Sequence, residues 1–144
     1  MAWRPIVHIE DISRAFMAVL GASHDLIHNK VFNVGINEEN YRVRELAEIV
    51  KDTVPNSRIE YAKDAEPDKR SYRVNFNKIS QALPEFKPQW NARRGAKQLY
   101  KVYKNVGFTL EEFEGPRYRR ISHVEEGVNT GRLDRTLHRR NAKI

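Results

Sequence analysis

The stretch AWRPIVHIEDISRAF, residues 2–16, places a short β-branched run directly before an amphipathic helix. The segment from Val7 to Ile9 predicts a strand, and Asp11 is a residue type that caps helices. The apolar residues that follow recur at the spacing of one buried helical face: Ile12, Ala15, Phe16, Val19 and Leu20. We therefore expect a strand and then a helix that ends at Gly21.

The same alternation continues along the chain. The run VFNVG, residues 31–35, predicts a short buried strand, and residues 43–54 carry a helical apolar stripe that ends before Pro55. Ile59 and Tyr61 alternate with charged residues, as in a half-buried strand. The order β-α-β-α-β predicts an α/β fold in which short mixed or parallel strands pack against amphipathic helices.

The second half of the sequence is expected to be helical in pieces. Asn75 can cap a helix that ends before Pro84, and residues 92–106 form a clear amphipathic pattern. Thr109 and Glu112 have the spacing of a capping box. After residue 115 the apolar periodicity thins among arginines, so we expect a domain over residues 1–115 and a basic, partly helical tail over residues 116–144.

Composition limits the class of protein. Hydrophobic residues make up 40% of the chain and charged residues 31%, and no apolar run approaches the roughly 18 residues that span a bilayer. The first residues lack the apolar core of a secretory signal, and the absence of cysteine excludes disulfides and cysteine-based zinc sites. We expect a soluble cytoplasmic protein with no membrane partner.

The net charge of +7 is unevenly distributed. Residues 117–144 hold 8 basic and 3 acidic residues, a net of +5, which leaves +2 for the remainder of the chain. A basic balance indicates a nucleic-acid partner when the charge forms a footprint on a folded face. The sequence favours a solvated extension instead, because Tyr118 is the one stacking aromatic in this tail.

The usual catalytic and cofactor motifs are absent from the sequence. The seven glycines form no G-x-G-x-x-G or P-loop, so we expect the chain alone to bind no cofactor. Tyr100 and Lys104 have the spacing Y-x-x-x-K, which we attribute to chance because the helix around them is an ordinary amphipathic one. His24 and His28 could share a metal ion, but a surface loop is favoured. We assign no catalytic residue and no metal site.

Several spaced blocks nevertheless match one known pattern. The segment RPIVHIEDISRAFMAVL resembles the R-x-x-x-H-V-x-D-x-A-x-A segment of extended short-chain dehydrogenases/reductases, the family of NAD-dependent nucleotide-sugar epimerases and dehydratases. Three further blocks follow in the family's order: KVFNVG, YRVRELAEIV and PDKRSYRVNFNKISQALPEFKPQW. The resemblance covers residues 3–107 and implies a partial fold of this family.

The resemblance also implies a function. It places the chain at the C-terminal, substrate-binding half of the family, without the N-terminal Rossmann half that carries NAD and the catalytic Ser, Tyr and Lys. The ligand would be a UDP- or dTDP-linked sugar. Arg4 and Arg70 match arginines that reach its diphosphate, and guanidinium groups suit phosphate oxygens. Asn33 either contacts substrate or holds the end of its strand, and His8 is expected to be a packed strand histidine.

Departures from the pattern leave the substrate identity open. Arg42 stands where the family has serine, Asn75 and Asn77 replace an aspartate and a serine, and residues 65–67 replace R-P-G. The first hypothesis is a substrate-binding part that is not catalytic on its own. The alternative is an interaction or self-assembly module that forms a homo-oligomer or binds a separate Rossmann-containing partner. Nucleic-acid binding through the basic tail ranks third.

Overall fold

The protein, represented by a computed structural model, is described over residues 2–61 and 70–139. Its contacts divide it into two compact units, Met1–Tyr100 (unit 1) and Lys101–Ile144 (unit 2). The boundary expected from the sequence, after residue 115, lies inside unit 2. None of the helices in the described part of the chain combines the length and the apolar composition needed to cross a membrane.

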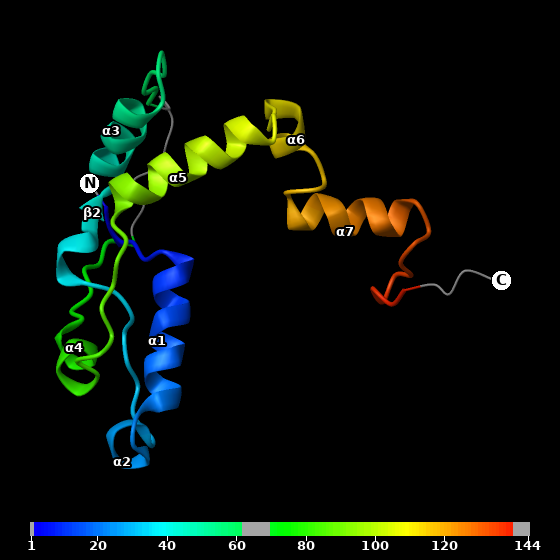
Figure 1. Ribbon diagram of the computed structural model, residues 1–144. Coiled ribbons are helices and arrows are strands. Elements are labelled where there is room, and N and C mark those ends of the chain that lie inside the picture. The colour runs from blue at the N-terminus through cyan, green and yellow to red at the C-terminus, as the bar shows by residue number, and fades with distance from the viewer. Residues whose placement is uncertain (1, 62–69, 140–144) are drawn as a thin grey trace. The chain divides into compact units, whose positions relative to one another are not determined.

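Unit 1 is a mixed α/β structure with more helix than strand (Figure 1). Its elements are, in chain order, β1 (Trp3–Pro5), α1 (Ile9–Gly21), α2 (His24–Ile27), a 3-10 turn η1 (Asn37–Glu39), β2 (Asn40–Arg42), α3 (Val43–Thr53), α4 (Asn77–Ala82) and the greater part of α5 (Ala92–Asn105). The predicted helices over 43–54 and 92–106 are confirmed within one residue at each end. The α/β class is therefore correct at this coarse level.

The strand predictions are wrong in position and direction. Within the described residues the sheet consists of β1 and β2, which pair antiparallel with Trp3 opposite Arg42 and Pro5 opposite Asn40. Residues 7–9 form no strand because the His8 side chain accepts the Glu10 N–H and begins α1 there. Residues 31–34 and 59–61 are unpaired. The predicted β-α-β-α-β order of short mixed or parallel strands is thus not observed in the described residues.

The VFNV segment explains how a strand-like pattern arises without a strand. Phe32 and Val34 pack against the core cluster, whereas Val31 is 81% exposed and Asn33 is also exposed. The alternation is that of an extended segment with one buried face. In the view of Figure 1 this cyan segment rises from α2 between α1 and α4. Its burial therefore comes from the two helices and not from sheet neighbours.

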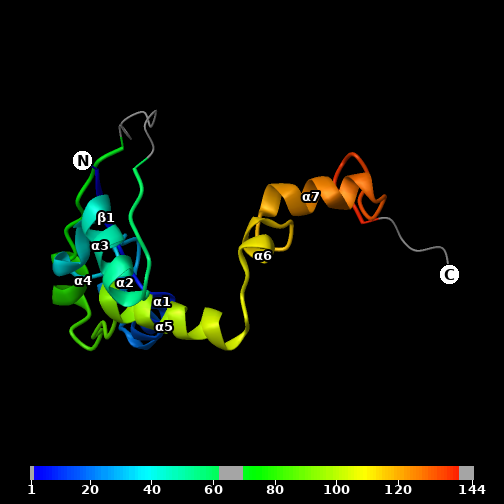
Figure 2. The ribbon, with the colours of Figure 1, turned by 90° about the horizontal axis from the view of Figure 1, so that it is seen from above.

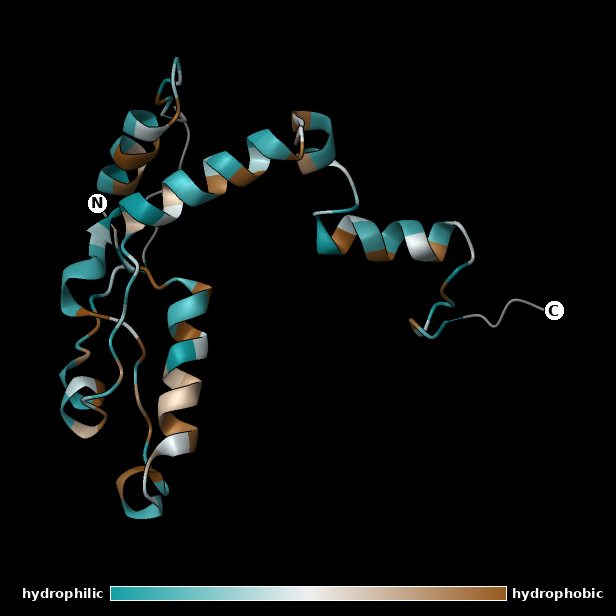
Figure 3. Cartoon of the chain, in the orientation of Figure 1, coloured by the Kyte–Doolittle hydropathy of each residue, from teal (hydrophilic) through white to brown (hydrophobic). Residues whose placement is uncertain are grey.

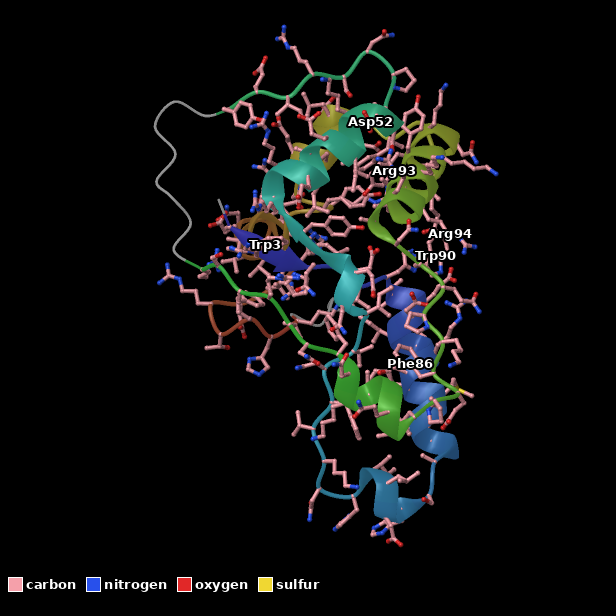
Figure 4. The ribbon with its side chains drawn as sticks, turned by 90° about the vertical axis from the view of Figure 1, so that its left-hand side faces the viewer. Trp3, Asp52, Phe86, Trp90, Arg93 and Arg94 are labelled. Atoms are coloured by element: carbon pink, nitrogen blue, oxygen red, sulfur yellow. The ribbon has the colours of Figure 1, made fainter. Side chains whose placement is uncertain are left out.

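The core of unit 1 lies between α1, α4 and the chain that follows α4. Its buried members, in chain order, are Ala15, Phe76, Ile79, Leu83 and Phe86. Ala15 lies on the inner face of α1 and belongs to the same buried cluster as Ile79 of α4. Ile79 and Leu83 are 1% and 0% exposed, so α4 is anchored although it has only six residues. Figure 4 labels Phe86 beside α4.

Gly35 is required where the VFNVG segment meets this core. Its φ of +154° is disfavoured for residues with a side chain, and an added Cβ would lie 2.8 Å from the Phe76 ring. We expect Gly35→Ala to lower the free energy of unfolding by about 2 kcal/mol, measured by urea denaturation. Gly21→Ala is the matched control, because a Cβ at Gly21 meets no atom within 4 Å. Equal midpoints for the two variants would contradict this account.

An exposed ion pair joins α3 and α5 in the described part of unit 1. Arg93 Nη1 lies 3.2 Å from Asp52 Oδ2, and Figure 4 shows the two labelled side chains between these helices. Figure 2 shows α3 beside β1, in agreement with the direct continuation of β2 into α3. An exposed pair of this kind contributes at most about 1 kcal/mol, so apolar packing rather than charge sets this arrangement.

Unit 2 contains the last residues of α5, α6 (Leu110–Glu114) and α7 (Arg120–Asn129). The predicted capping box is confirmed, since Thr109 and Glu112 exchange backbone and side-chain hydrogen bonds of 3.2 Å. The Phe108 ring contacts those of Tyr103, Phe113 and Tyr118 and forms an aromatic cluster. Figure 3 shows brown apolar turns alternating with teal ones along α7, an amphipathic pattern. The expected partly helical tail is therefore observed over residues 120–129.

Candidate functional site

Arg4 lies in the middle of β1, and its guanidinium group serves first as a structural clamp. Its Nη1 donates to the Trp3 carbonyl oxygen at 2.7 Å and to the carbonyl oxygen of Arg70. Its Cζ lies 5.6 Å from the centroid of the Tyr72 ring, a cation–π distance. Arg4 therefore fastens the segment around residues 70–72 to β1 and supplies positive charge behind an aromatic ring.

Arg70 is brought next to Arg4, as the sequence hypothesis requires, but through its backbone. The segment that begins at Arg70 runs along β1, where the Trp3 N–H donates to the Ser71 hydroxyl at 3.2 Å and the Tyr72 N–H donates to the Trp3 carbonyl at 3.5 Å. The Arg70 side chain is exposed. The R-P-G position of the family pattern, residues 65–67, lies outside the described residues.

Asn33 lies in the wall of a shallow groove beside the end of β1. The groove has a volume of about 260 Å³ and is lined by Pro5, Ile6, Val7, Asn33, Val34, Tyr72, Val74 and Phe76. The Asn33 side-chain amide donates to the Asn75 carbonyl oxygen at 3.5 Å, the limit of a hydrogen bond. Three segments far apart in the sequence thus supply one surface: residues 5–7, 33–34 and 72–76.

The third of these segments, residues 72–76, has the alternation of a strand. Tyr72, Val74 and Phe76 line the groove, whereas Arg73 and Asn75, together with Val74, line a neighbouring pocket. Side chains of an extended chain point alternately to its two faces. The period of two in RSYRVNF, residues 70–76, is the signal that could have predicted this surface and the place of Tyr72 in it.

The groove is suited to a ring with an anionic substituent. Among the described residues its lining is apolar and aromatic apart from the Asn33 amide, and it includes no carboxylate. Apolar walls with a few polar groups are typical of small-molecule sites. The Arg4 guanidinium lies over the Tyr72 ring and contacts the backbone of Arg70, and guanidinium N–H groups are suited to phosphate oxygens. A carboxylate or phosphate ligand is thus favoured electrostatically over a cationic one.

His8 is held by its surroundings and has no free ring nitrogen. Its Nδ1 accepts the Glu10 N–H at 3.1 Å, and its Nε2 lies 2.7 Å from Gln98 Oε1, which assigns the proton to Nε2. The ring stacks on Trp90 with centroids 3.9 Å apart. His8 is therefore a capping and packing residue at the start of α1, neither a strand residue nor a general base.

Asp11, expected to cap that helix, has a different role. It lies inside α1, is 1% exposed, and its carboxylate accepts the backbone N–H groups of Gln89 and Trp90, each at 2.9 Å. Arg14 Nη1 lies 2.9 Å from the same carboxylate. Asp11 thus binds a segment almost 80 residues further along the chain to α1, which corrects the sequence interpretation.

A second buried polar residue, Glu39, directly precedes β2 and was not predicted from the sequence. Glu39 is 6% exposed and accepts the Ala92 N–H at the start of α5 at 2.7 Å and the Tyr41 hydroxyl at 3.0 Å. The side chain of Asn40, a residue that is 8% exposed, exchanges two hydrogen bonds with the backbone of Val74. A neighbouring strand would make the same two bonds with its backbone. These side chains hold residues 74 and 92 beside β2 without any further strand.

Burial of Tyr41 and its hydrogen bond to Glu39 raise the pKa of Tyr41 to about 12. Below pH 10 the tyrosine is protonated in both states, so its contribution to stability is complete. Between pH 10 and 12 the unfolded chain ionises first, and the free energy of unfolding falls. We expect a steeper fall over this range for the wild type than for Tyr41→Phe in urea denaturation. Parallel curves for the two proteins would contradict the assignment.

The other sequence candidates form no recognisable site. The rings of His24 and His28 stack with centroids 4.3 Å apart, and His24 Nδ1 lies 3.6 Å from Asp25 Oδ1. In the part of the chain that the structure describes, no three His, Asp or Glu side chains gather as metal ligands would. Tyr100 and Lys104 lie on α5, on either side of the boundary between the two units.

Comparison with known proteins identifies no family for this chain. No family model matches it, and no solved structure matches it significantly.

Proposed function

We propose that unit 1 is the nucleotide-sugar-binding part of a cytoplasmic, NAD-dependent sugar epimerase or dehydratase of the extended short-chain dehydrogenase/reductase type, and that it is not catalytic on its own. The observation that carries the proposal is the groove itself. It gathers Asn33 and Tyr72 at the end of β1, next to Arg4. These residues come from three separate sequence blocks that resemble the family.

The physical properties of the groove support this ligand class. A volume of about 260 Å³ is small for a whole drug-sized ligand, whose sites begin at roughly 300 Å³, so the groove would hold one ring of a UDP- or dTDP-sugar. The diphosphate would extend toward Arg4 and Arg70, where guanidinium groups supply charge-assisted hydrogen bonds. A neutral ring and an anionic linker thus each find a suitable surface.

NAD would bind outside the groove. The sequence contains no glycine-rich dinucleotide fingerprint. In the proposed scheme NAD and the catalytic Ser, Tyr and Lys belong to a separate Rossmann-containing partner, and this chain binds and orients the sugar nucleotide. This chain would contribute to catalysis by orienting the sugar nucleotide, because orientation alone lowers the barrier of a bimolecular step.

The test is calorimetric titration of the full chain with UDP, UDP-glucose and dTDP-glucose. We expect binding that Asn33→Ala and Arg70→Gln each weaken by about tenfold, the loss of one charge-assisted or ligand hydrogen bond. Arg58→Gln is the control, since Arg58 is exposed and pairs with Glu60 at 2.7 Å outside the groove. Binding that is absent, or unchanged in both groove variants, would refute the proposal.

A second candidate function, self-association, is favoured by the outer face of α1. Four apolar side chains there are 66–80% exposed: Ile9, Phe16, Met17 and Leu20. The prediction that Phe16 and Leu20 lie on the buried face of this helix is therefore wrong. Such a helix is apolar on two sides, which is unusual for a monomer surface. Sedimentation velocity should show a concentration-dependent dimer that Phe16→Glu abolishes. A wild-type chain that stays monomeric across the concentration series would exclude a homo-oligomer.

A further inference from the structure

Trp3 carries two arginine side chains on its indole ring. The Cζ of Arg42 lies 5.2 Å from the ring centroid and that of Arg73 lies 4.7 Å from it. The topology explains the arrangement, because Trp3 pairs with Arg42 across the sheet and the Tyr72 N–H donates to the Trp3 carbonyl. We call Trp3, Arg42 and Arg73 the Trp3 cluster.

Among the described residues, the cluster is a concentration of positive charge without a balancing acid. Over residues 2–61 and 70–139, the guanidinium groups of Arg42 and Arg73 form no ion pair and no hydrogen bond, and both side chains are exposed. Both lie within 5.2 Å of one ring centroid, so their separation is within a Debye length, about 10 Å at 0.1 M salt. A bound anion would relieve their mutual repulsion.

The neighbouring charges do not remove this preference. Arg4 adds a third cation, since it donates to the Trp3 carbonyl oxygen. The Glu45 carboxylate lies near the start of α3, but it accepts the Arg42 backbone N–H at 2.6 Å. The cluster therefore keeps a net positive charge with Glu45 included.

A polar pocket adjoins the cluster on the side of Arg73. It has a volume of about 300 Å³ and is lined by Asn37, Asn40, Arg73, Val74 and Asn75. Arg73 and Asn75 point away from the groove that Tyr72 and Phe76 line, because the segment is extended. A ligand in this pocket would thus occupy a different face from the groove.

We infer that Arg42 and Arg73, stacked on Trp3, bind a phosphate group of a small phosphorylated ligand at a second anion site outside the groove. Guanidinium groups fixed on an aromatic face present their N–H edges outward, and these edges match two phosphate oxygens. Stacking on one indole also holds both side chains in place, which reduces the entropy lost on binding. The site does not depend on the nucleotide-sugar proposal, since none of its three residues lines the groove.

The test uses the full chain and pyrophosphate, titrated by calorimetry and by tryptophan fluorescence. We expect Arg42→Gln and Arg73→Gln each to weaken pyrophosphate binding by about tenfold, and Trp3→Phe to remove the fluorescence response. Arg94→Gln is the matched control, because the Arg94 Cζ lies 4.4 Å from the Trp90 ring in an equivalent stack. Figure 4 shows Trp90 and Arg94 well separated from Trp3.

Three results would overturn the inference. Undiminished affinity in Arg42→Gln and Arg73→Gln would show that pyrophosphate binds elsewhere. An equal loss in Arg94→Gln would show a general charge effect. A single-stranded oligonucleotide that binds more tightly than pyrophosphate through the same two arginines would replace the small ligand by nucleic acid. A parallel titration with UDP separates the two proposals, because Asn33→Ala should weaken UDP binding and leave pyrophosphate binding unchanged.

Discussion

Replacement of Asp11 by asparagine is expected to lower the free energy of unfolding by roughly 3–5 kcal/mol. The carboxylate is 1% exposed, and its two oxygens accept the backbone N–H groups of Gln89 and Trp90. Asparagine has one acceptor oxygen, so its NH₂ group would face a backbone N–H that cannot turn away. One donor would then be buried without a partner, and Arg14 would lose one of its two carboxylate partners.

Urea denaturation followed by circular dichroism measures this loss as a lower midpoint with an unchanged slope. Asp25→Asn is the matched control, because the Asp25 side chain is fully exposed and its replacement should change stability by no more than about 0.5 kcal/mol. If Asp11→Asn unfolded at the same urea concentration as the control, the buried carboxylate would not be what joins α1 to residues 89–90.

Asp11 also shows where inference from the sequence ends. Its position just before an apolar helical stripe is typical of a capping residue, and local spacing gave no sign of partners at residues 89 and 90. His8 took the capping role, because its ring nitrogen accepts the Glu10 N–H. Hydrogen bonds between segments far apart in the chain leave no periodic signal in the sequence.

The helices could be predicted and the strands could not, for a related reason. The apolar stripes of α3 and α5 are local patterns, and so is the capping box of Thr109 and Glu112. A strand depends on a partner that local patterns do not identify. The Asn40 side chain takes the place of a neighbouring strand, because it bonds to both the N–H and the carbonyl group of Val74. The residues around Val74 therefore run beside β2 without joining the sheet.

The sequence names Arg4, Arg70 and Asn33 as substrate-binding candidates but does not predict how they are arranged. Arg4 and Arg70 are adjacent, but Arg4 donates to the backbone carbonyl of Arg70. Asn33 lines the groove with Tyr72, which the family pattern did not single out. From the sequence, Arg42 is only a departure from the family's serine. Its stacking on Trp3 follows from the pairing of β1 with β2.

Replacement of Glu39 by methionine is expected to cost about 3 kcal/mol of unfolding free energy, whereas Glu39→Gln should cost about 1 kcal/mol. Methionine leaves the Ala92 N–H and the Tyr41 hydroxyl buried without an acceptor. Glutamine keeps one oxygen for the Ala92 N–H, and its NH₂ group can donate to Tyr41, because a hydroxyl can reverse from donor to acceptor. Asp11 has no such adaptable partner, since both of its backbone donors are fixed.

A double-mutant cycle with Tyr41→Phe separates the two hydrogen bonds of Glu39. In Glu39→Met the Tyr41 hydroxyl has lost its acceptor, so removal of that hydroxyl should cost less in this background than in the wild type. The remaining loss then belongs to the Ala92 N–H at the start of α5. Strictly additive effects in urea denaturation would mean that Tyr41 and Glu39 stabilise the protein independently. They would also remove the hydrogen bond as a cause of the raised pKa of Tyr41, which would leave burial as its largest cause.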